Sequence, residues 1–80
     1  MEPDEIKSLL EQGLEGARAE VSDMTGGGDH FEVTIVAPAF EGLSLVERHQ
    51  LVYRLLNVGG SEAIHALSLK AYTAEEWARV

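Results

Sequence analysis

The 80-residue sequence contains no cysteine, so this chain supplies no disulfide bond, no cysteine-bound zinc and no thiol chemistry. It also lacks a run of about 18 consecutive apolar residues, the length that a transmembrane helix requires. The start of the chain, residues 1–5, is acidic, whereas signal and transit peptides start with basic residues. We therefore expect a cytoplasmic protein with no membrane association.

Positive charge is scarce as well. Six basic residues stand against 14 acidic ones, which gives a formal net charge of −8. The acidity is uneven, because residues 1–41 hold 10 acids and 2 bases while residues 42–80 hold 4 of each. Nucleic-acid phosphates attract clusters of lysine and arginine, so this charge disfavours non-specific nucleic-acid binding. A local basic patch is still compatible with it.

The length predicts a single domain over residues 1–80, near the lower end of what folds unaided, since such a chain buries only about 60% of its unfolded surface. Its 45% hydrophobic and 25% charged content is typical of a globular protein. No linker, internal repeat or low-complexity segment divides the chain.

Residues 3–17 are predicted to form an amphipathic helix, whose apolar stripe has a spacing of three to four residues. The stripe consists of Ile6, Leu9, Leu10, Gly13 and Ala17. A glycine within a buried stripe indicates close backbone packing at Gly13. Gly16 is expected to help end the helix.

Two strands are predicted next, a weak one over residues 18–24 and a clearer one over residues 30–37, where apolar and polar residues alternate. The glycine-rich segment 25–29 between them is typical of a turn. The two strands are therefore expected to form an antiparallel hairpin.

A second helix starts at Ser44, because Ser44 and Glu47 have the spacing of a capping box. Its end is expected within residues 57–60, and a single helical turn is possible over residues 61–63. The predicted buried face consists of Leu45, Val52 and Leu56, widened by Val46, Tyr53 and Leu55.

A third strand is predicted over residues 64–71, and Thr73 with Glu76 forms a second capping box before a short helix that carries Trp77. The order is thus α-β-β-α-β-α. This order predicts an α+β domain in which helices pack on one face of a three-stranded sheet.

No nucleophile elbow and no phosphate-binding loop occurs in the sequence, so we expect a protein that is not an enzyme. Three histidines are the remaining metal-ligating groups. The pattern makes His49 a half-buried structural residue, His30 a solvated residue on the polar side of its strand, and His65 a residue at the edge of the core. Two histidines on separate elements are able to meet at a metal ion, but spacing alone leaves this open.

Three segments together resemble the signatures of the BolA family, in the family's order and over nearly the whole chain. They are residues 30–36 (HFEVTIV), 40–53 (FEGLSLVERHQLVY) and 64–77 (IHALSLKAYTAEEW). The resemblance implies a fold like that of class II KH domains. It also implies a non-enzymatic heterodimer with a monothiol glutaredoxin, acting in iron–sulfur cluster trafficking or iron homeostasis.

In such heterodimers a 2Fe–2S cluster bridges the two proteins, with glutathione and the glutaredoxin cysteine on one iron. For the other iron the resemblance implies His65 and a residue from the loop between the first two strands, where His30 is the candidate. Some relatives use a cysteine slightly earlier in this loop, where this chain has Gly27 and Gly28. Binding through His65 alone, or a complex without a cluster, is the alternative.

The isolated chain is expected to hold no metal and to be a monomer or a weak homodimer. A second interpretation is a nucleic-acid-binding transcriptional regulator that uses the KH-like fold. Its basic patch would consist of Arg48, Arg54 and Lys70. Arg48 and Arg54 are more often typical of a solvated helix face.

Overall fold

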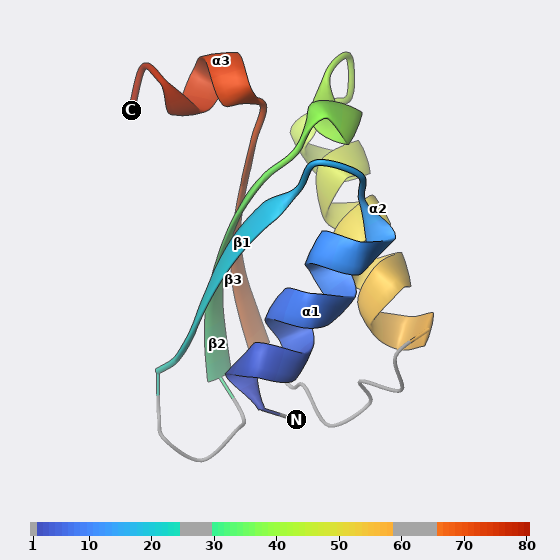
Figure 1. The fold of residues 1–80 in the computed structure, drawn as a ribbon, viewed down its shortest axis with the longest axis vertical. Helices are drawn as coiled ribbons and strands as arrows, with labels where there is room; N and C mark the ends of the chain where they lie inside the picture. The colour runs from blue at the N-terminus through green and yellow to red at the C-terminus, as the bar shows by residue number, and fades with distance from the viewer. Residues whose placement is uncertain (1, 25–29, 59–65) are drawn as a thin grey trace.

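The computed structural model describes residues 2–24, 30–58 and 66–80, without the side chains of residues 57, 58 and 66. Its elements are α1 (Pro3–Gly13), β1 (Arg18–Asp23), β2 (His30–Val36), the 3-10 turn η1 (Pro38–Phe40), α2 (Leu45–Val58), β3 (Ala66–Tyr72) and α3 (Ala74–Trp77) (Figure 1). The predicted order is confirmed, with η1 as an addition. The turns expected at 25–29 and 61–63, and the first two residues of the expected third strand, lie outside the described residues. Among the described helices none is long and apolar enough to cross a membrane.

Helix α1 ends earlier than predicted, at Gly13 instead of residue 17. The next residue, Leu14, already has extended backbone angles of φ −127° and ψ 117°. Gly16 then has a φ of +73°, a left-handed conformation that glycine adopts without steric strain. The chain therefore turns toward β1 where the apolar spacing alone would have continued the helix.

The sheet has the strand order β1-β2-β3 and is mixed. Strands β1 and β2 pair antiparallel, with Val21 opposite Val33, which confirms the predicted hairpin. Strands β2 and β3 pair parallel, with Val33 opposite Leu69. Parallel neighbours need a crossover connection, and α2 lies in it.

The helices α1 and α2 cover one face of the sheet, while α3 stands apart from them at the end of β3 (Figure 1). Strand β2 shows the alternation that this layering requires, since Phe31, Val33 and Ile35 are buried and His30 and Glu32 are exposed. Between the helices and the sheet lies one core. It consists of Ile6, Leu10, Leu14, Ala19, Phe31, Val33, Ile35, Ala37, Phe40, Val52, Leu56 and Ala71.

The two long helices approach each other closely at Gly13. A Cβ atom at this position would lie only 2.8 Å from Cδ2 of Leu55 on α2. This confirms the close backbone packing that a glycine in the apolar stripe predicted.

The predicted buried face of α2 is partly wrong. Leu45 and Val46 are 65% and 66% exposed, and Tyr53 is 43% exposed, whereas Val52 and Leu56 are buried as expected. Leu45 and Val46 belong to the first turn of α2, where Arg48 takes the inward position in place of an aliphatic side chain. An exposed apolar strip therefore remains along α2.

The left-handed conformation of Gly16, in the turn before β1, leads to a testable prediction. Replacing Gly16 with alanine should lower the free energy of unfolding by about 1–2 kcal/mol, because a Cβ atom is strained at this φ. Urea unfolding followed by circular dichroism measures the change. The exposed neighbour Glu15 provides the control, and Glu15→Ala should change stability much less. Equal losses in the two variants would show that the φ of Gly16 imposes no such constraint.

Candidate functional site

The described histidine of the predicted metal site is His30, the first residue of β2. Its side chain is exposed, as expected for the polar side of the strand. Its backbone is held on both sides, because its carbonyl accepts a hydrogen bond of 2.8 Å from the N–H of Met24 and its register partner on β3 is Ala66. The imidazole thus projects from a paired position at one end of the sheet.

Of the other two histidines, the structure describes His49 but not His65. His65 lies outside the described residues, and its role as a metal ligand stays a prediction. His49 on α2 is half-buried, which confirms the structural position predicted for it. In the described part of the chain, no three side chains of His, Cys, Asp or Glu gather into a group able to hold a metal ion.

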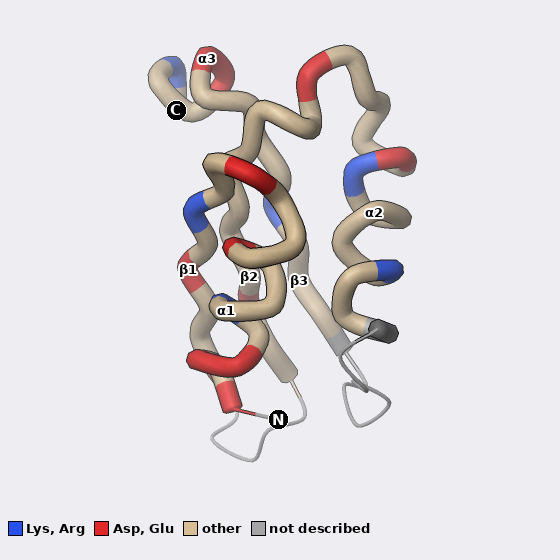
Figure 2. Tube along the Cα trace, turned by 45° about the vertical axis from the view of Figure 1, so that its right-hand side comes forward, with Lys and Arg blue, Asp and Glu red and all other residues tan. Residues whose placement is uncertain are grey.

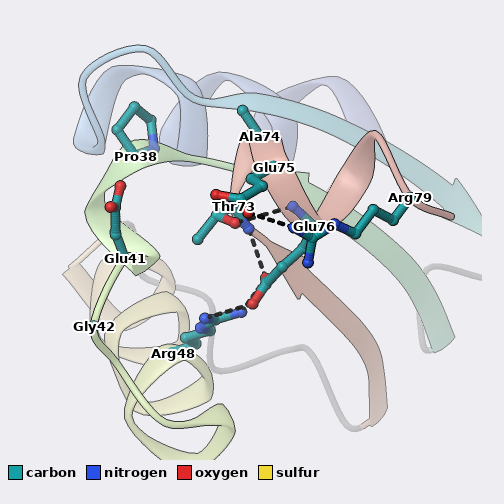
Figure 3. Close-up of a pocket in the computed structure, with 9 residues that line it drawn as sticks. All are labelled: Pro38, Glu41, Gly42, Arg48, Thr73, Ala74, Glu75, Glu76 and Arg79. Atoms are coloured by element: carbon teal, nitrogen blue, oxygen red, sulfur yellow. Dashed lines mark hydrogen bonds and ion pairs between the residues drawn. The ribbon is translucent and has the colours of Figure 1, made fainter.

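Arg48 makes a polar cluster with Glu76 and Thr73 (Figure 3). The cluster contacts Ala71, near the end of the sheet opposite to His30. The Nε of Arg48 donates to the carbonyl of Leu43 at 3.0 Å, and its Nη1 donates to the carbonyl of Ala71 at 3.2 Å. Both terminal nitrogens pair with the carboxylate of Glu76, at 2.6 and 3.2 Å. The guanidinium carbon also lies 5.9 Å from the ring centroid of Phe40. One side chain thereby joins α2, β3, α3 and the segment before α2.

Glu76 has two roles in this cluster. Its Oε1 also accepts a hydrogen bond of 2.9 Å from the N–H of Thr73, whose hydroxyl accepts one of 3.2 Å from the N–H of Glu76. This confirms the predicted capping box at Thr73 and Glu76. The Arg48 guanidinium, and after it the Thr73 N–H, lower the pKa of Glu76 to about 2. The same carboxylate raises the pKa of Arg48.

The interpretation of Arg48 as part of a solvated helix face is wrong, since Arg48 is only 7% exposed. Sequence reasoning missed its pairing with Glu76. The capping box gives Glu76 a sufficient local role, and no periodicity connects it with a residue 28 positions away. The other capping box, of Ser44 and Glu47, is present as predicted at distances of 2.9 and 3.2 Å. Its hydrogen bonds lower the pKa of Glu47.

A surface cavity adjoins the Arg48 cluster (Figure 3). It is lined by Pro38, Glu41, Gly42, Arg48, Thr73, Ala74, Glu75, Glu76 and Arg79. The central polar groups of the cavity hydrogen-bond one another, and Arg79 pairs with Glu75. The lining therefore fixes α3 against the rest of the domain. Along β2 the cavity and His30 are separated by the strand length, about 20 Å.

The charged residues are segregated in the fold. Most acidic residues lie on the α1 and β1 side, whereas α2 and β3 carry Arg54 and Lys70 (Figure 2). Both of these cations are exposed, and neither has an ion pair within the described residues. Nucleic-acid binding through Arg48, Arg54 and Lys70 stays a prediction, and Arg48 would have to leave Glu76 to take part.

Comparison with known proteins identifies the family. The family model described as BolA-like protein matches residues 8–76. The chain is 44% identical over 80 residues to the acid stress protein IbaG of Escherichia coli, covering 99% of this chain and 92% of that protein. A bolA protein homologue from Coxiella burnetii has a solved structure with a TM-score of 0.78 and 41% identity, covering 99% of both chains. This chain therefore belongs to the BolA family.

A third relative is the DNA-binding transcriptional regulator BolA of Haemophilus influenzae. It is 44% identical over 52 residues, which cover 65% of this chain and 50% of the regulator. The family assignment confirms the resemblance seen in the sequence motifs.

The Arg48 cluster predicts unequal effects for two adjacent glutamates. Glu76→Gln removes the charge that compensates a buried guanidinium, so the urea midpoint should fall clearly. Glu75→Gln removes an exposed ion pair with Arg79, and such pairs contribute little to stability. Urea unfolding of both variants measures the difference. Similar midpoints for the two variants would contradict a stabilising role for the Arg48–Glu76 pair.

The lowered pKa of Glu76 predicts an acid-dependent loss of stability. The folded carboxyl has a pKa of about 2, below its ordinary value of 4.5, so the unfolded chain binds its proton more readily. The stabilisation from Glu76 should be complete above about pH 5 and lost as the pH falls toward about 2. The gap in unfolding free energy between wild type and Glu76→Gln should shrink over this range. A gap that is constant with pH would refute the assignment.

Proposed function

We propose that this protein is a non-enzymatic adaptor that forms a heterodimer with a monothiol glutaredoxin and co-ligates a 2Fe–2S cluster bridging the two proteins. Its role would lie in iron–sulfur cluster trafficking or in the regulation of iron homeostasis. The proposed ligands from this chain are His65 and His30. Glutathione and the glutaredoxin cysteine would hold the other iron.

The observation that carries the proposal is the register of the parallel strands. His30 is paired with Ala66, the residue that directly follows His65 in the chain. Consecutive Cα atoms are about 3.8 Å apart, so His65 is one residue from the register partner of His30 along the chain. The pairing of β2 with β3 would hold His30 beside the start of β3, from which His65 would reach the same iron.

The ligand chemistry of the chain agrees with a shared site. Thiolates are the usual ligands of iron–sulfur clusters, and a chain without cysteine needs a partner to provide them. Neutral imidazoles are known to complete one iron of a 2Fe–2S cluster, and they raise its reduction potential relative to thiolates. A bound cluster would supply a one-electron redox centre or an iron–sulfur unit for transfer. The histidines of this chain would bind one iron of the cluster, and as neutral ligands they would make the net charge of the cluster less negative than thiolates would.

The name of the Haemophilus influenzae relative favours a second candidate, DNA binding by a transcriptional regulator. The net charge of −8 opposes it, and Arg48 is held by Glu76. DNA binding that weakens steeply with salt would support this candidate, since phosphate contacts release counterions.

The decisive experiment is anaerobic reconstitution of the cluster with a mixture of this protein, a monothiol glutaredoxin and glutathione. Visible circular dichroism should show a spectrum distinct from that of the glutaredoxin homodimer. His65→Ala should abolish it, and His30→Ala should weaken or alter it. The half-buried His49 provides the matched control, and His49→Ala should leave the spectrum unchanged.

Two outcomes would count against the proposal. A mixture that shows only the homodimer spectrum would overturn cluster sharing by this chain. A heterodimer spectrum that survives His65→Ala would overturn the ligand assignment.

A further inference from the structure

The two edges of the sheet differ in how their backbone groups are satisfied. At the β1 edge, the N–H of Ala19 donates to Glu11 Oε2 at 3.0 Å and its carbonyl accepts from Lys7 Nζ at 2.8 Å. Lys7 and Glu11 also pair with each other at 2.9 Å. Side chains of helix α1 thus cover this edge at Ala19, near the start of β1, and covering an edge is a known way to prevent edge strands from pairing with another chain.

The hydrogen bond from the N–H of Ala37 to the carbonyl of Tyr72 establishes the orientation of β3. It shows that the backbone groups of Tyr72 face β2. Backbone groups of successive residues in a strand point to opposite sides. Lys70 and Ser68 therefore also face β2.

The backbone groups of Leu67, Leu69 and Ala71 consequently face the free edge of β3. The hydrogen bond from Arg48 to the carbonyl of Ala71 agrees with this orientation. Within the residues that the structure describes, no hydrogen bond reaches the N–H or carbonyl of Leu67 or Leu69 at this edge. Four backbone groups at alternate residues are thus available to another strand.

An exposed apolar surface stands beside this free edge, and we name it the α2 flank. On α2, Leu55 packs toward Gly13 of α1, and the α2 flank lies on the side turned away from α1. That is the β3 side of the sheet (Figure 2). The α2 flank consists of the exposed side chains of Leu45, Val46 and Tyr53, with the half-buried His49 between them.

We propose that the β3 edge and the α2 flank bind a second copy of this chain, so that the two β3 strands pair antiparallel about a two-fold axis at Ser68. In this register Leu67 of each copy faces Leu69 of the other. Antiparallel residues opposed in this way exchange two hydrogen bonds, so the two copies together would form four. All four free groups are used, and the carbonyl of Ala71 stays with Arg48.

The distribution of charge also favours a second copy of this chain as the partner of the β3 edge. Residues 42–80, which include α2 and β3, hold four acids and four bases, whereas residues 1–41 hold ten acids and two bases. A dimer through β3 joins the two neutral sides and keeps the two acidic sides at its outer ends. In the proposed register Lys70 faces Ala66 of the second copy, so no like charges oppose each other. Both α2 flanks lie on the same face of the extended six-stranded sheet, where they are able to pack together.

The absence of cysteine allows a direct test by single-cysteine variants. At a two-fold axis, Ser68 would face its own copy as a non-hydrogen-bonded pair with Cα atoms about 4.5 Å apart, within the range of a disulfide. Ser68→Cys should therefore form a disulfide dimer on mild oxidation, at least about tenfold faster than the controls. Lys70→Cys lies on the same strand and face, but its two copies would be about 14 Å apart. Ser22→Cys probes the β1 edge.

Non-reducing electrophoresis measures the rate, and circular dichroism checks that each variant folds. Ser68→Cys that oxidises no faster than Lys70→Cys would overturn the register. Ser22→Cys that oxidises as fast as Ser68→Cys would overturn the choice of edge.

Sedimentation equilibrium of the cysteine-free protein tests the proposed dimer a second way, by measuring its oligomeric state. The wild type, of 8.7 kDa per chain, should show a concentration-dependent dimer. Tyr53→Glu on the α2 flank should weaken it, whereas Arg54→Gln, which lowers the net charge equally on an adjacent exposed side chain, should not. A wild type that stays monomeric at millimolar concentration would overturn the proposal, as would equal effects of the two substitutions.

Discussion

The buried guanidinium of Arg48 is the constraint on which the packing of α2, β3 and α3 at one end of the sheet depends. A charge taken out of water must be paired and hydrogen-bonded, and Arg48 meets this requirement with the carbonyls of Leu43 and Ala71 and the carboxylate of Glu76. These partners belong to the segment before α2, to β3 and to α3. The short helix α3 buries no residue of its own, so the Arg48–Glu76 ion pair, together with the contact between the rings of Trp77 and Tyr72, sets its position.

This arrangement divides the sheet into two ends with different chemistry. At the end where Val36 pairs with Tyr72, the Arg48 cluster uses its polar groups internally. At the other end, His30 is exposed and its paired neighbour Ala66 adjoins His65 in the chain. The proposed ligand end would need a rigid support, and the pairing of β2 with both neighbouring strands would supply it. The stability of the domain and its proposed binding chemistry are therefore separated along the strands.

Local patterns predicted the elements well, because each element carries its own signal. Alternation located β2, and the spacing of Thr73 and Glu76 located the start of α3. Local patterns failed where a distant residue decides the outcome. The burial of Arg48 depends on Glu76, 28 positions away. At the end of α1 the local signal of Gly16 was present, but the apolar spacing up to Ala17 extended the predicted helix past Gly13. The assignment of His65 rests on the family motif and has no physical signal in the sequence that separates a ligand from a core-edge histidine.

Charge and edge protection act in the same direction in this molecule. The acidic side, with α1 and β1, repels nucleic acid and a second acidic chain, and its strand edge is also covered at Ala19 by the Lys7–Glu11 pair. The side formed by α2 and β3 is nearly neutral, has free backbone groups at Leu67 and Leu69, and exposes the α2 flank. Neither property alone would select one side for a protein partner, because a neutral covered edge forms no hydrogen bonds and an open acidic edge repels. Their coincidence on β3 makes this side the one at which another protein chain can approach and pair.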